Sequence, residues 1–468
     1  MKDDATSLAQ AIRGGRLSAT EAMQAALAAA ERRSDLGAIV HFDPELGSKA
    51  ASAADALLAK QAFADRPFLG VPSLAKDLGG PFSGLPVAAG SRMIDRQSAQ
   101  SDSDLAARLR NAGLCFFGLT TVPELGLSLS SEPAVGPQAR NPLDPSLTPG
   151  GSSGGAAAAV CAGIVSIAHA TDAGGSIRVP AACCGLVGLK ATRGVMPGGP
   201  GFNNHLGGIV SELALCRSVR DLTTIFHLAS GKARGPFADP HLQAAQSGPF
   251  RIGVLTNFGT DFPIDGQRAA AIEAAAALLE AYGHTLVPIA WSKLEQAVSA
   301  SGRTLGDIIA VNLANYVDAA ELDAERAERL TRAFIRRGQS LTGQALWASL
   351  DAGIHASRAL WDVFNDVDCI LTPMLSTAPL PLGSFPFDHD DTELQIGRMT
   401  AFAPLAALAN ITGFPAMTLP FGADAYGLPL PVQIMAPMGH DELLLALAQR
   451  LEQEERWQHR FPVAIEGV

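Results

Sequence analysis

The stretch Thr148-Pro-Gly-Gly-Ser-Ser-Gly-Gly-Ala-Ala-Ala-Ala-Val-Cys161 sets a glycine-rich loop directly before an alanine-rich helical run. A second loop of the same kind, Thr171-Asp-Ala-Gly-Gly-Ser-Ile-Arg-Val-Pro180, follows the short apolar run Ile164–Ala168. Outward from these loops, between Gly70 and Leu215, short apolar runs alternate with helix-like segments. This alternation predicts an α/β fold in which loops carry the function.

The rest of the chain adds helices on either side of this region. Periodic apolar residues predict N-terminal helices between residues 5 and 34 and a largely helical stretch from Asp265 to Asp366. The other expected elements are a helix over Asp102–Ala112, strands at Leu114–Leu119, Arg251–Leu255, Cys369–Thr372 and Pro431–Met435, turns over Pro415–Pro429, and a closing helix at Asp441–Glu454. We therefore expect one large domain with a helical insertion.

The composition excludes several classes of protein. Of 468 residues, 47% are apolar and 17% are charged, which supplies a large core and argues against disorder. The net charge of −11 argues against nucleic-acid binding, and the arginines of Arg326–Arg337 alternate with acidic and apolar residues, as on a solvated amphipathic helix. The apolar stretch Gly155–Ala170 is too short for a membrane span and the N-terminus shows no secretory signal, so we expect a cytoplasmic protein. The six scattered cysteines fit a reduced core.

Serine among glycines in both loops indicates a possible reacting group. Glycine lets backbone N–H groups approach a reacting centre closely, and consecutive N–H groups can bind an oxyanion. Two structural turns are the plain alternative, because glycine and serine are turn residues. A phosphate-binding loop would need a lysine that both loops lack. Gly150–Gly154 matches a nucleophile elbow, but the chain reaches it through the loop Asn141–Pro149 rather than through an apolar strand.

A serine nucleophile needs a base, and lysine is the more informative candidate. Of the ten histidines, His169 suits a core role, His205 could line a pocket, and His389 in an acidic loop lacks a second ligand at metal spacing. Only seven lysines occur, and two of them, Lys76 and Lys190, lie in apolar segments. Burial disfavours the ammonium form, so either lysine could be neutral near pH 7 and act as a base. The residues alone leave this choice open.

Together these segments resemble the amidase signature family. The resemblance rests on Gly70-Val-Pro with Lys76-Asp77, on Pro149-Gly-Gly-Ser-Ser-Gly-Gly155, and on Thr171-Asp-Ala-Gly-Gly-Ser-Ile-Arg178 with the run Pro180–Lys190. It extends to Ile12–Ser18, Ile370–Pro373, Thr412–Ala416 and Gly427–Gln433, and it is weakest across residues 230–360. The family implies a single α/β domain over residues 1–468, with a twisted mixed β-sheet covered by α-helices on both sides. The signature core would span about 66–215, and a variable helical substrate region about 265–366.

The resemblance also assigns roles to residues. It implies that Ser176 is the acylated nucleophile, Ser152 the proton relay and Lys76 the base, which leaves Lys190 a structural role. A cis peptide bond would join Gly151 to Ser152. The implied oxyanion hole consists of the backbone N–H groups of Ala173, Gly174, Gly175 and Ser176. The supporting side chains would be those of Ser153, Thr171, Asp172 and Arg178, with Asp172 and Arg178 able to pair, and neither a metal nor another cofactor is implied.

The implied activity is hydrolysis of a carboxylic amide through an acyl-enzyme. The expected partner is a small aryl, aliphatic or cyclic amide, with neither nucleic acid nor membrane involved and a homodimer left open. We expect the pocket walls to come from Leu125–Ser131, Phe202–His205 and residues 300–350. Two alternatives are a glutamine-hydrolysing amidotransferase subunit and a catalytically inactive binding protein on the same fold. The segment Ala191–Pro200 departs from the Tyr-Gly-Arg-Val-Ser pattern of the former, and the complete Lys76–Ser152–Ser176 set argues against the latter.

Overall fold

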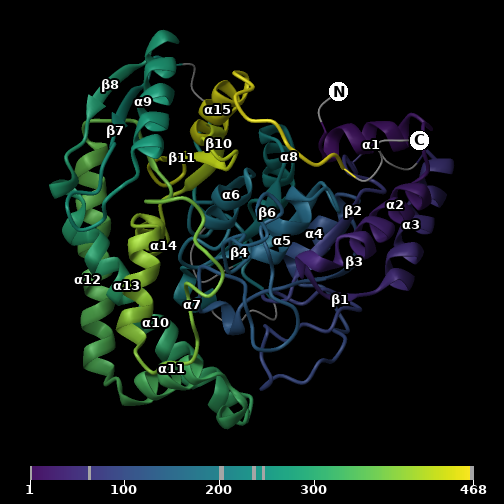
Figure 1. Cartoon of the computed structure of the whole chain (residues 1–468), viewed down its shortest axis with the longest axis horizontal. Helices are drawn as coiled ribbons and strands as arrows, with labels where there is room; N and C mark the ends of the chain where they lie inside the picture. The colour runs from purple at the N-terminus through teal and green to yellow at the C-terminus, as the bar shows by residue number, and fades with distance from the viewer. Residues whose placement is uncertain (1–2, 62–64, 200–204, 235–238, 245–247, 464–468) are drawn as a thin grey trace.

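A mixed β-sheet forms the centre of the computed structural model, which describes residues 3–61, 65–199, 205–234, 239–244 and 248–463 (Figure 1). Its eleven strands in these residues are β1 Ile39–Phe42, β2 Pro72–Lys76, β3 Cys115–Thr120, β4 Ile167–Asp172, β5 Val187–Lys190, β6 Ser211–Cys216, β7 Arg251–Val254, β8 Thr285–Pro288, β9 Cys369–Pro373, β10 Ala416–Ala423 and β11 Pro429–Met435. Their order across the sheet is β1-β3-β2-β4-β6-β5-β10-β11-β9-β7-β8. The runs β3-β2-β4 and β9-β7-β8 are parallel, and the other neighbours are antiparallel.

Helices cover both sides of this sheet. They are α1 Ala5–Arg13, α2 Ala19–Arg32, α3 Pro44–Ala59, α4 Asp104–Asn111, α5 Gly154–Cys161, α6 Arg178–Cys184, α7 His205–Gly208, α8 Val219–Ala229, α9 Gly266–Ala281, α10 Glu295–Ala319, α11 Arg329–Ser340, α12 Gly343–Phe364, α13 Thr392–Phe402, α14 Ala406–Thr412 and α15 Asp441–Glu452. On one side α5 and α6 pack against each other and against the strands, while α8, α15 and α9 form a layer on the other. The long helix α10 contacts α11, α12, α13 and α14 in a separate group of helices (Figure 1).

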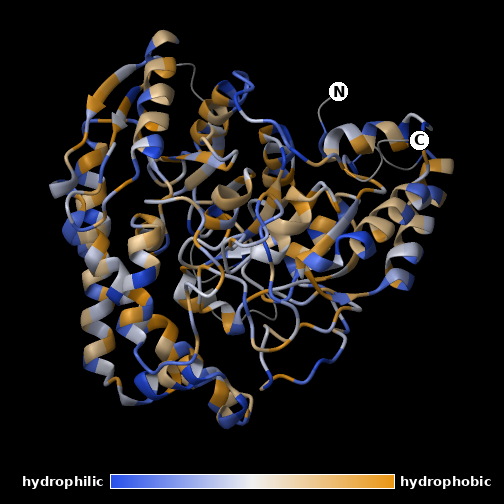
Figure 2. Cartoon of the chain, in the orientation of Figure 1, coloured by the Kyte–Doolittle hydropathy of each residue, from blue (hydrophilic) through white to orange (hydrophobic). Residues whose placement is uncertain are grey.

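The strands near the two serine loops are buried because both faces of the sheet are covered. Every residue of β2, β3 and β4 is buried, including polar side chains such as Lys76 and Asp172 at the strand ends. All eight residues of α5 are buried as well, and its alanines allow the helix to lie close to the sheet. Figure 2 shows hydrophobic residues along the strands and on one side of several outer helices, with hydrophilic residues on the other side.

Most expected elements are present, with informative exceptions. Only the end of the apolar run Ile164–Ala168 belongs to a strand, since β4 begins at Ile167; Gly163, with a φ of 75°, turns the chain after α5. The prediction of turns over Pro415–Pro429 was wrong for Ala416–Ala423, which form β10 and pair with β5 and β11, and right for the turn at residues 424–428. The stretch Asp265–Asp366 contains β8 among its helices, and its first helix, α9, packs on β9 and β11.

Two further expectations concern the oxidation state of the cysteines and membrane-spanning helices. All six cysteines are buried and free of disulfides, as expected for a reduced core. Among the described helices, none combines the length and the apolar character needed to cross a bilayer.

Candidate active site

The ends of two parallel strands bring the predicted base close to the nucleophile loop. β2 and β4 pair directly at Leu74 and Ala168, so their carboxyl ends lie at the same edge of the sheet. Lys76 ends β2, and Asp172 ends β4 just before the loop that carries Ser176. The loop before α5 brings Ser152 into contact with Lys76 at this edge.

Lys76 is buried in contact with two hydroxyl groups. Its Nζ lies 2.8 Å from Ser152 Oγ and 2.7 Å from Thr171 Oγ1, and it donates to the Thr171 carbonyl oxygen at 3.4 Å. Burial lowers the pKa of Lys76 to about 7, although the carboxylates of Asp172 and Glu212 act in the opposite direction. Lys76 is therefore neutral in a large fraction of the protein molecules at pH 7, as a general base requires.

Lys190 is equally buried but has a different neighbour. Burial and the charge of Arg178 lower the pKa of Lys190 to about 7 as well, so ionisation does not distinguish the two lysines. The Lys190 Nζ donates to the carbonyl oxygen of Ala191 at 2.7 Å, whereas Lys76 contacts Ser152. These contacts distinguish Lys76 from Lys190, two lysines that the sequence alone left equally eligible as the base.

The loop around Ser152 is packed tightly against neighbouring backbone. A Cβ on Gly151 would lie 2.1 Å from the carbonyl oxygen of Ser130, so only glycine fits there. The peptide bond between Gly151 and Ser152 is cis, which confirms the prediction. Ser153 donates its hydroxyl to the Thr171 carbonyl oxygen at 3.2 Å and so ties this loop to β4.

Asp172 shapes the loop that carries Ser176. Its carboxylate accepts hydrogen bonds from the N–H groups of Gly175 at 2.7 Å and Ile177 at 3.2 Å, and it pairs with Arg178 at 3.0 Å, as predicted. Burial raises the pKa of Asp172, but the Arg178 charge and these hydrogen bonds outweigh it and lower the pKa to about 2. The loop that carries Ser176 is thus folded around a carboxylate that stays ionised at neutral pH.

One of the four predicted oxyanion donors is already engaged. The Gly175 N–H is donated to Asp172 Oδ1, which corrects the prediction for this residue. Ala173 and Ser176 line the cavity described below. An oxyanion site on this loop would therefore use the N–H groups of Ala173, Gly174 and Ser176.

Arg178 connects the nucleophile loop to the C-terminal part of the chain. Its guanidinium donates to Asn410 Oδ1 at 2.7 Å and to Gln433 Oε1 at 3.1 Å. Asn410 in turn donates to the Asp172 carbonyl oxygen at 2.9 Å. Sequence reasoning did not single out Asn410, because no local motif surrounds it; Gln433 entered only as part of the resemblance.

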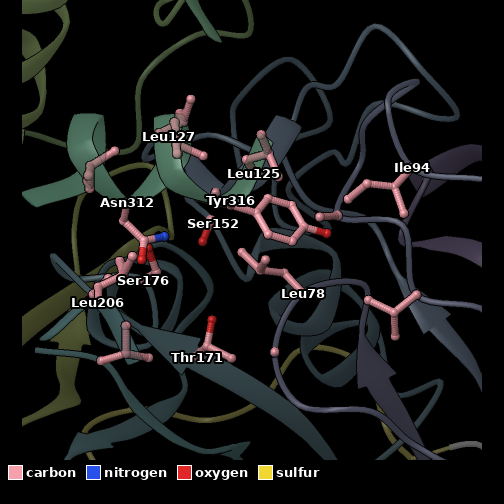
Figure 3. A pocket seen from close by; sticks show the side chains of 18 of the residues that line it. Leu78, Ile94, Leu125, Leu127, Ser152, Thr171, Ser176, Leu206, Asn312 and Tyr316 are labelled. Carbon is pink, nitrogen blue, oxygen red and sulfur yellow. The ribbon is translucent and has the colours of Figure 1, made fainter. Parts of the chain in front are cut away.

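A cavity of about 460 Å³ lies beside the two serines (Figure 3). Ser152, Thr171 and Ser176 line it, and Figure 3 shows their side chains around the same space. Most of the other described lining residues are apolar, and the polar exceptions are Gln97, Asn312 and Tyr316. No Asp, Glu, Lys, Arg or His occurs among the described residues that line the cavity.

Two of the three predicted wall segments contribute to this cavity. Leu125, Gly126 and Leu127 form part of one wall, and α10 supplies Ile309, Asn312, Leu313 and Tyr316 (Figure 3). Phe202–Asn204 and the side chain of His205 lie outside the described residues. A further wall between Leu78 and Ala99 was not predicted. The sequence did offer a reason to expect this wall. The segment follows Lys76-Asp77 directly, so its first residues must lie close to the predicted base.

The described histidines do not assemble a metal site. Among the residues that the structure describes, no three His, Cys, Asp or Glu side chains gather as metal binding would require. His389 accepts a hydrogen bond from the Asp391 N–H at 3.2 Å and lies 3.2 Å from Arg398. His169 pairs with Glu212 in the interior, consistent with the expected core role.

Comparisons with known proteins identify similar sequences and structures. A family model described as Amidase matches residues 20–445. The 6-aminohexanoate-cyclic-dimer hydrolase of Paenarthrobacter ureafaciens is 31% identical, over 98% of this chain and 96% of its own length. A solved structure of 6-aminohexanoate cyclic dimer hydrolase has a TM-score of 0.89 at 29% identity and covers 99% of both chains. A bacterial aryl acylamidase of the amidase signature enzymes, 21% identical, shares the fold with a TM-score of 0.86 over 99% of both chains.

Proposed function

Because the chain belongs to the amidase family and is a hydrolase of carbon–nitrogen bonds, we propose that it cleaves an uncharged carboxylic amide through an acyl-enzyme on Ser176. The observation that carries the proposal is the 2.8 Å contact between Lys76 Nζ and Ser152 Oγ, beside the cavity that Ser176 also lines. A buried amine of lowered pKa, a hydroxyl in contact with it and a second hydroxyl facing the same cavity are the parts of a proton relay.

Thr171 is suited to orient the neutral amine of Lys76. A neutral lysine has two N–H groups and one lone pair. The Thr171 carbonyl can only accept, and the Thr171 hydroxyl can accept as well, so both N–H groups have acceptors on this one residue. The lone pair is then left for the hydroxyl of Ser152, whose proton Lys76 can take.

The proposed reaction has two halves. First, Ser176 passes its proton to Ser152 while Ser152 passes its own to Lys76, and the Ser176 oxygen attacks the amide carbonyl carbon. The oxyanion accepts hydrogen bonds from the N–H groups of Ala173, Gly174 and Ser176. The carbon–nitrogen bond then breaks as Lys76 returns a proton through Ser152 to the leaving nitrogen. Second, water attacks the resulting ester, its proton follows the same route to Lys76 and back, and the carboxylic acid leaves Ser176.

The lining of the cavity favours an uncharged substrate. Burial of an unpaired carboxylate or ammonium group is costly, and the described lining has no charged side chain to pair with either. Free glutamine carries both charges, whereas a cyclic amide carries neither. The relatives named for 6-aminohexanoate cyclic dimer support a cyclic amide as the first candidate among small aryl, aliphatic and cyclic amides. The cavity volume lies within the range of about 300–1,000 Å³ common for small-molecule sites.

The test compares three substrates with wild-type protein and the Ser176→Ala variant. We expect the wild type to cleave the cyclic dimer of 6-aminohexanoate and to act far more slowly on the linear dimer and on glutamine, because these carry charges. Ser176→Ala should lose hydrolysis and labelling by a fluorophosphonate probe while keeping its circular dichroism spectrum. Hydrolysis that survives Ser176→Ala would overturn the mechanism. Glutamine hydrolysis that needs a partner subunit would instead support an amidotransferase subunit.

A further inference from the structure

A buried pair lies next to the base: His169 of β4 and Glu212 of β6. The register of these antiparallel strands sets Thr171 opposite Glu212, so His169 is a diagonal neighbour of Glu212 on the same face of the sheet. His169 Nε2 lies 3.0 Å from Glu212 Oε2, and the two side chains are 0% and 3% exposed. The ring of Phe82 packs against the imidazole with its centre 4.9 Å away.

His169 also holds the backbone of Lys76. The Lys76 N–H donates to His169 Nδ1 at 3.2 Å. The ladder between β2 and β4 pairs Leu74 with Ala168, and two residues further along β2 the imidazole serves as the acceptor in place of a strand carbonyl. A ring nitrogen that accepts a hydrogen bond carries no hydrogen, so the neutral ring has its proton on Nε2 and donates it to Glu212.

Glu212 holds the same segment of chain a second time. Its Oε2 accepts the Gly80 N–H at 3.3 Å, so the backbone is tied to the pair at Lys76 and again at Gly80. Between these points Gly79 lines the cavity, and a Cβ there would lie 2.8 Å from Glu212 Oε2. The pair therefore fixes both the base and the first part of the cavity wall.

Three carboxylates lie near Lys76 on different parts of the chain. Asp172, the last residue of β4, is paired with Arg178 of α6, and Asp77, directly after β2, is paired with Arg96. Glu212 approaches from β6, and His169 Nε2 lies 3.0 Å from its carboxylate. Burial lowers the pKa of Lys76, and the negative charges of Asp172 and Glu212 counter part of that effect.

We propose that His169 and Glu212 are positioning residues of the amidase reaction, which hold the Lys76 backbone and, through the Glu212 carboxylate, govern how readily Lys76 gives up its proton. Their role presupposes that Lys76 is the base of the proposed function. Neither residue is among the described residues that line the cavity, so both act through Lys76 rather than on the substrate. A carboxylate favours the ammonium form of a nearby lysine. Glu212 thereby keeps the base strong enough to take a proton, while burial keeps it available near neutral pH.

The pH dependence of Ser176 labelling by a fluorophosphonate probe tests this without a known substrate. Glu212→Gln keeps an oxygen that can accept from His169 and Gly80 but removes the charge. We expect its labelling midpoint to move to lower pH by about one unit, because the ammonium form of Lys76 loses a stabilising neighbour. Glu212→Asp keeps the charge and should label with a midpoint near that of the wild type, at a lower rate.

Two further variants separate position from charge. His169→Leu removes the acceptor of the Lys76 N–H but keeps the carboxylate, so its labelling rate should fall about 10- to 100-fold while its midpoint does not fall. Asp441→Asn is the matched control, since Asp441 is a buried carboxylate that accepts the Thr192 N–H at 2.8 Å and acts on Lys190. Its midpoint should equal that of the wild type.

The outcomes distinguish this role from the proposed function. A Glu212→Gln midpoint at or above that of the wild type overturns the role, and so does an equal downward shift in Glu212→Asp. A lowered midpoint in His169→Leu overturns it too, and this measurement stands even where Glu212→Gln does not fold. Absence of Ser176 labelling in the wild type would overturn the proposed function instead.

Discussion

At the residue scale, the buried lysines show how neighbours decide what a side chain can do. The pKa of Lys76 and that of Lys190 are both lowered to about 7, with burial as the main cause. Lys76 reaches the hydroxyls of Ser152 and Thr171, whereas the Nζ of Lys190 donates to a carbonyl oxygen that has no proton to exchange. Proton transfer needs a neighbour that can both give and take a proton, which Ser152 supplies to Lys76.

The activity should follow the ionisation of Lys76. Only the neutral amine accepts a proton, so kcat/KM should rise with pH around the Lys76 pKa of about 7 and be lost as the pH falls below it. Lys76→Met should lower kcat/KM about 10²- to 10⁴-fold. Lys190→Met should keep the midpoint of the wild type. Steady-state kinetics across this pH range check both variants, and a midpoint that moves in Lys190→Met would contradict the roles given to the two lysines.

The residues of the candidate site differ in how far the sequence could predict them. Ser152 and Ser176 lie in glycine-rich loops that are unusual in themselves, and the family resemblance was still needed to choose Lys76. Glu212 and Asn410 have no such local mark. Glu212 meets His169 through the register of β4 and β6, and Asn410 meets Asp172 across 238 residues of chain. These contacts exist only after the sheet and its helices have assembled.

At the element scale, the glycines of the Ser152 loop let α5 begin against neighbouring backbone. The Gly155 N–H donates to the Thr121 carbonyl oxygen at 3.1 Å. A Cβ on Gly155 would lie 2.4 Å from the Thr121 nitrogen and 2.6 Å from the Ala38 carbonyl oxygen. Backbone atoms cannot swing aside as a flexible side chain can. Gly155 is therefore required by packing, independently of the chemistry proposed for Ser152.

Two glycine substitutions should show this close approach. Gly155→Ala should destabilise the protein by about 1–3 kcal/mol, because the methyl group overpacks against backbone. Gly266→Ala, at the start of α9, meets nothing within 4 Å and should be neutral or stabilising by up to about 1 kcal/mol. Thermal or denaturant unfolding measures both changes. Equal stability of Gly155→Ala and wild type would mean that α5 can move away from Thr121 and Ala38 at little cost.

The strand β10 shows where local residue preferences give the wrong element. Its surroundings are rich in proline and glycine, which favour turns in isolation. In the fold, β10 lies between β5 and β11 and pairs with both. Pro420 is accommodated opposite Pro431, next to an irregular register. Pairing and burial from distant strands override the local preference, and no window of the sequence contains that information.

At the scale of the whole molecule, the cavity is lined both by the sheet with its covering loops and by the separate helix group around α10. The proposed reacting groups come from β2 and from the loops before α5 and α6, which belong to the sheet and its cover. One wall comes from residues between Leu78 and Ala99 together with Leu125–Leu127, and another is a face of α10, the centre of the separate helix group (Figure 3). Of the reacting groups assigned above, none lies on α10, so recognition can change there without disturbing the relay.

Truncation of the α10 side chains should therefore change selectivity rather than chemistry. Asn312→Ala and Tyr316→Ala should alter kcat/KM for individual amides by about 10- to 200-fold and change their ranking. Labelling of Ser176 by a small fluorophosphonate should stay close to the wild-type rate. Trp347→Ala, on α12 and 74% exposed, is the control that should alter neither. Loss of labelling in the α10 variants would show that the helix supports the relay itself.

The face of α10 that lines the cavity also bears on how such an enzyme can diversify. Descendants of one ancestral chain could acquire new substrates through changes at Ile309, Asn312, Leu313 and Tyr316 while inheriting an unaltered sheet. A laboratory library confined to these four codons would repeat that history in miniature. Growth selection with different amides as the nitrogen source would then enrich the variants that hydrolyse each amide.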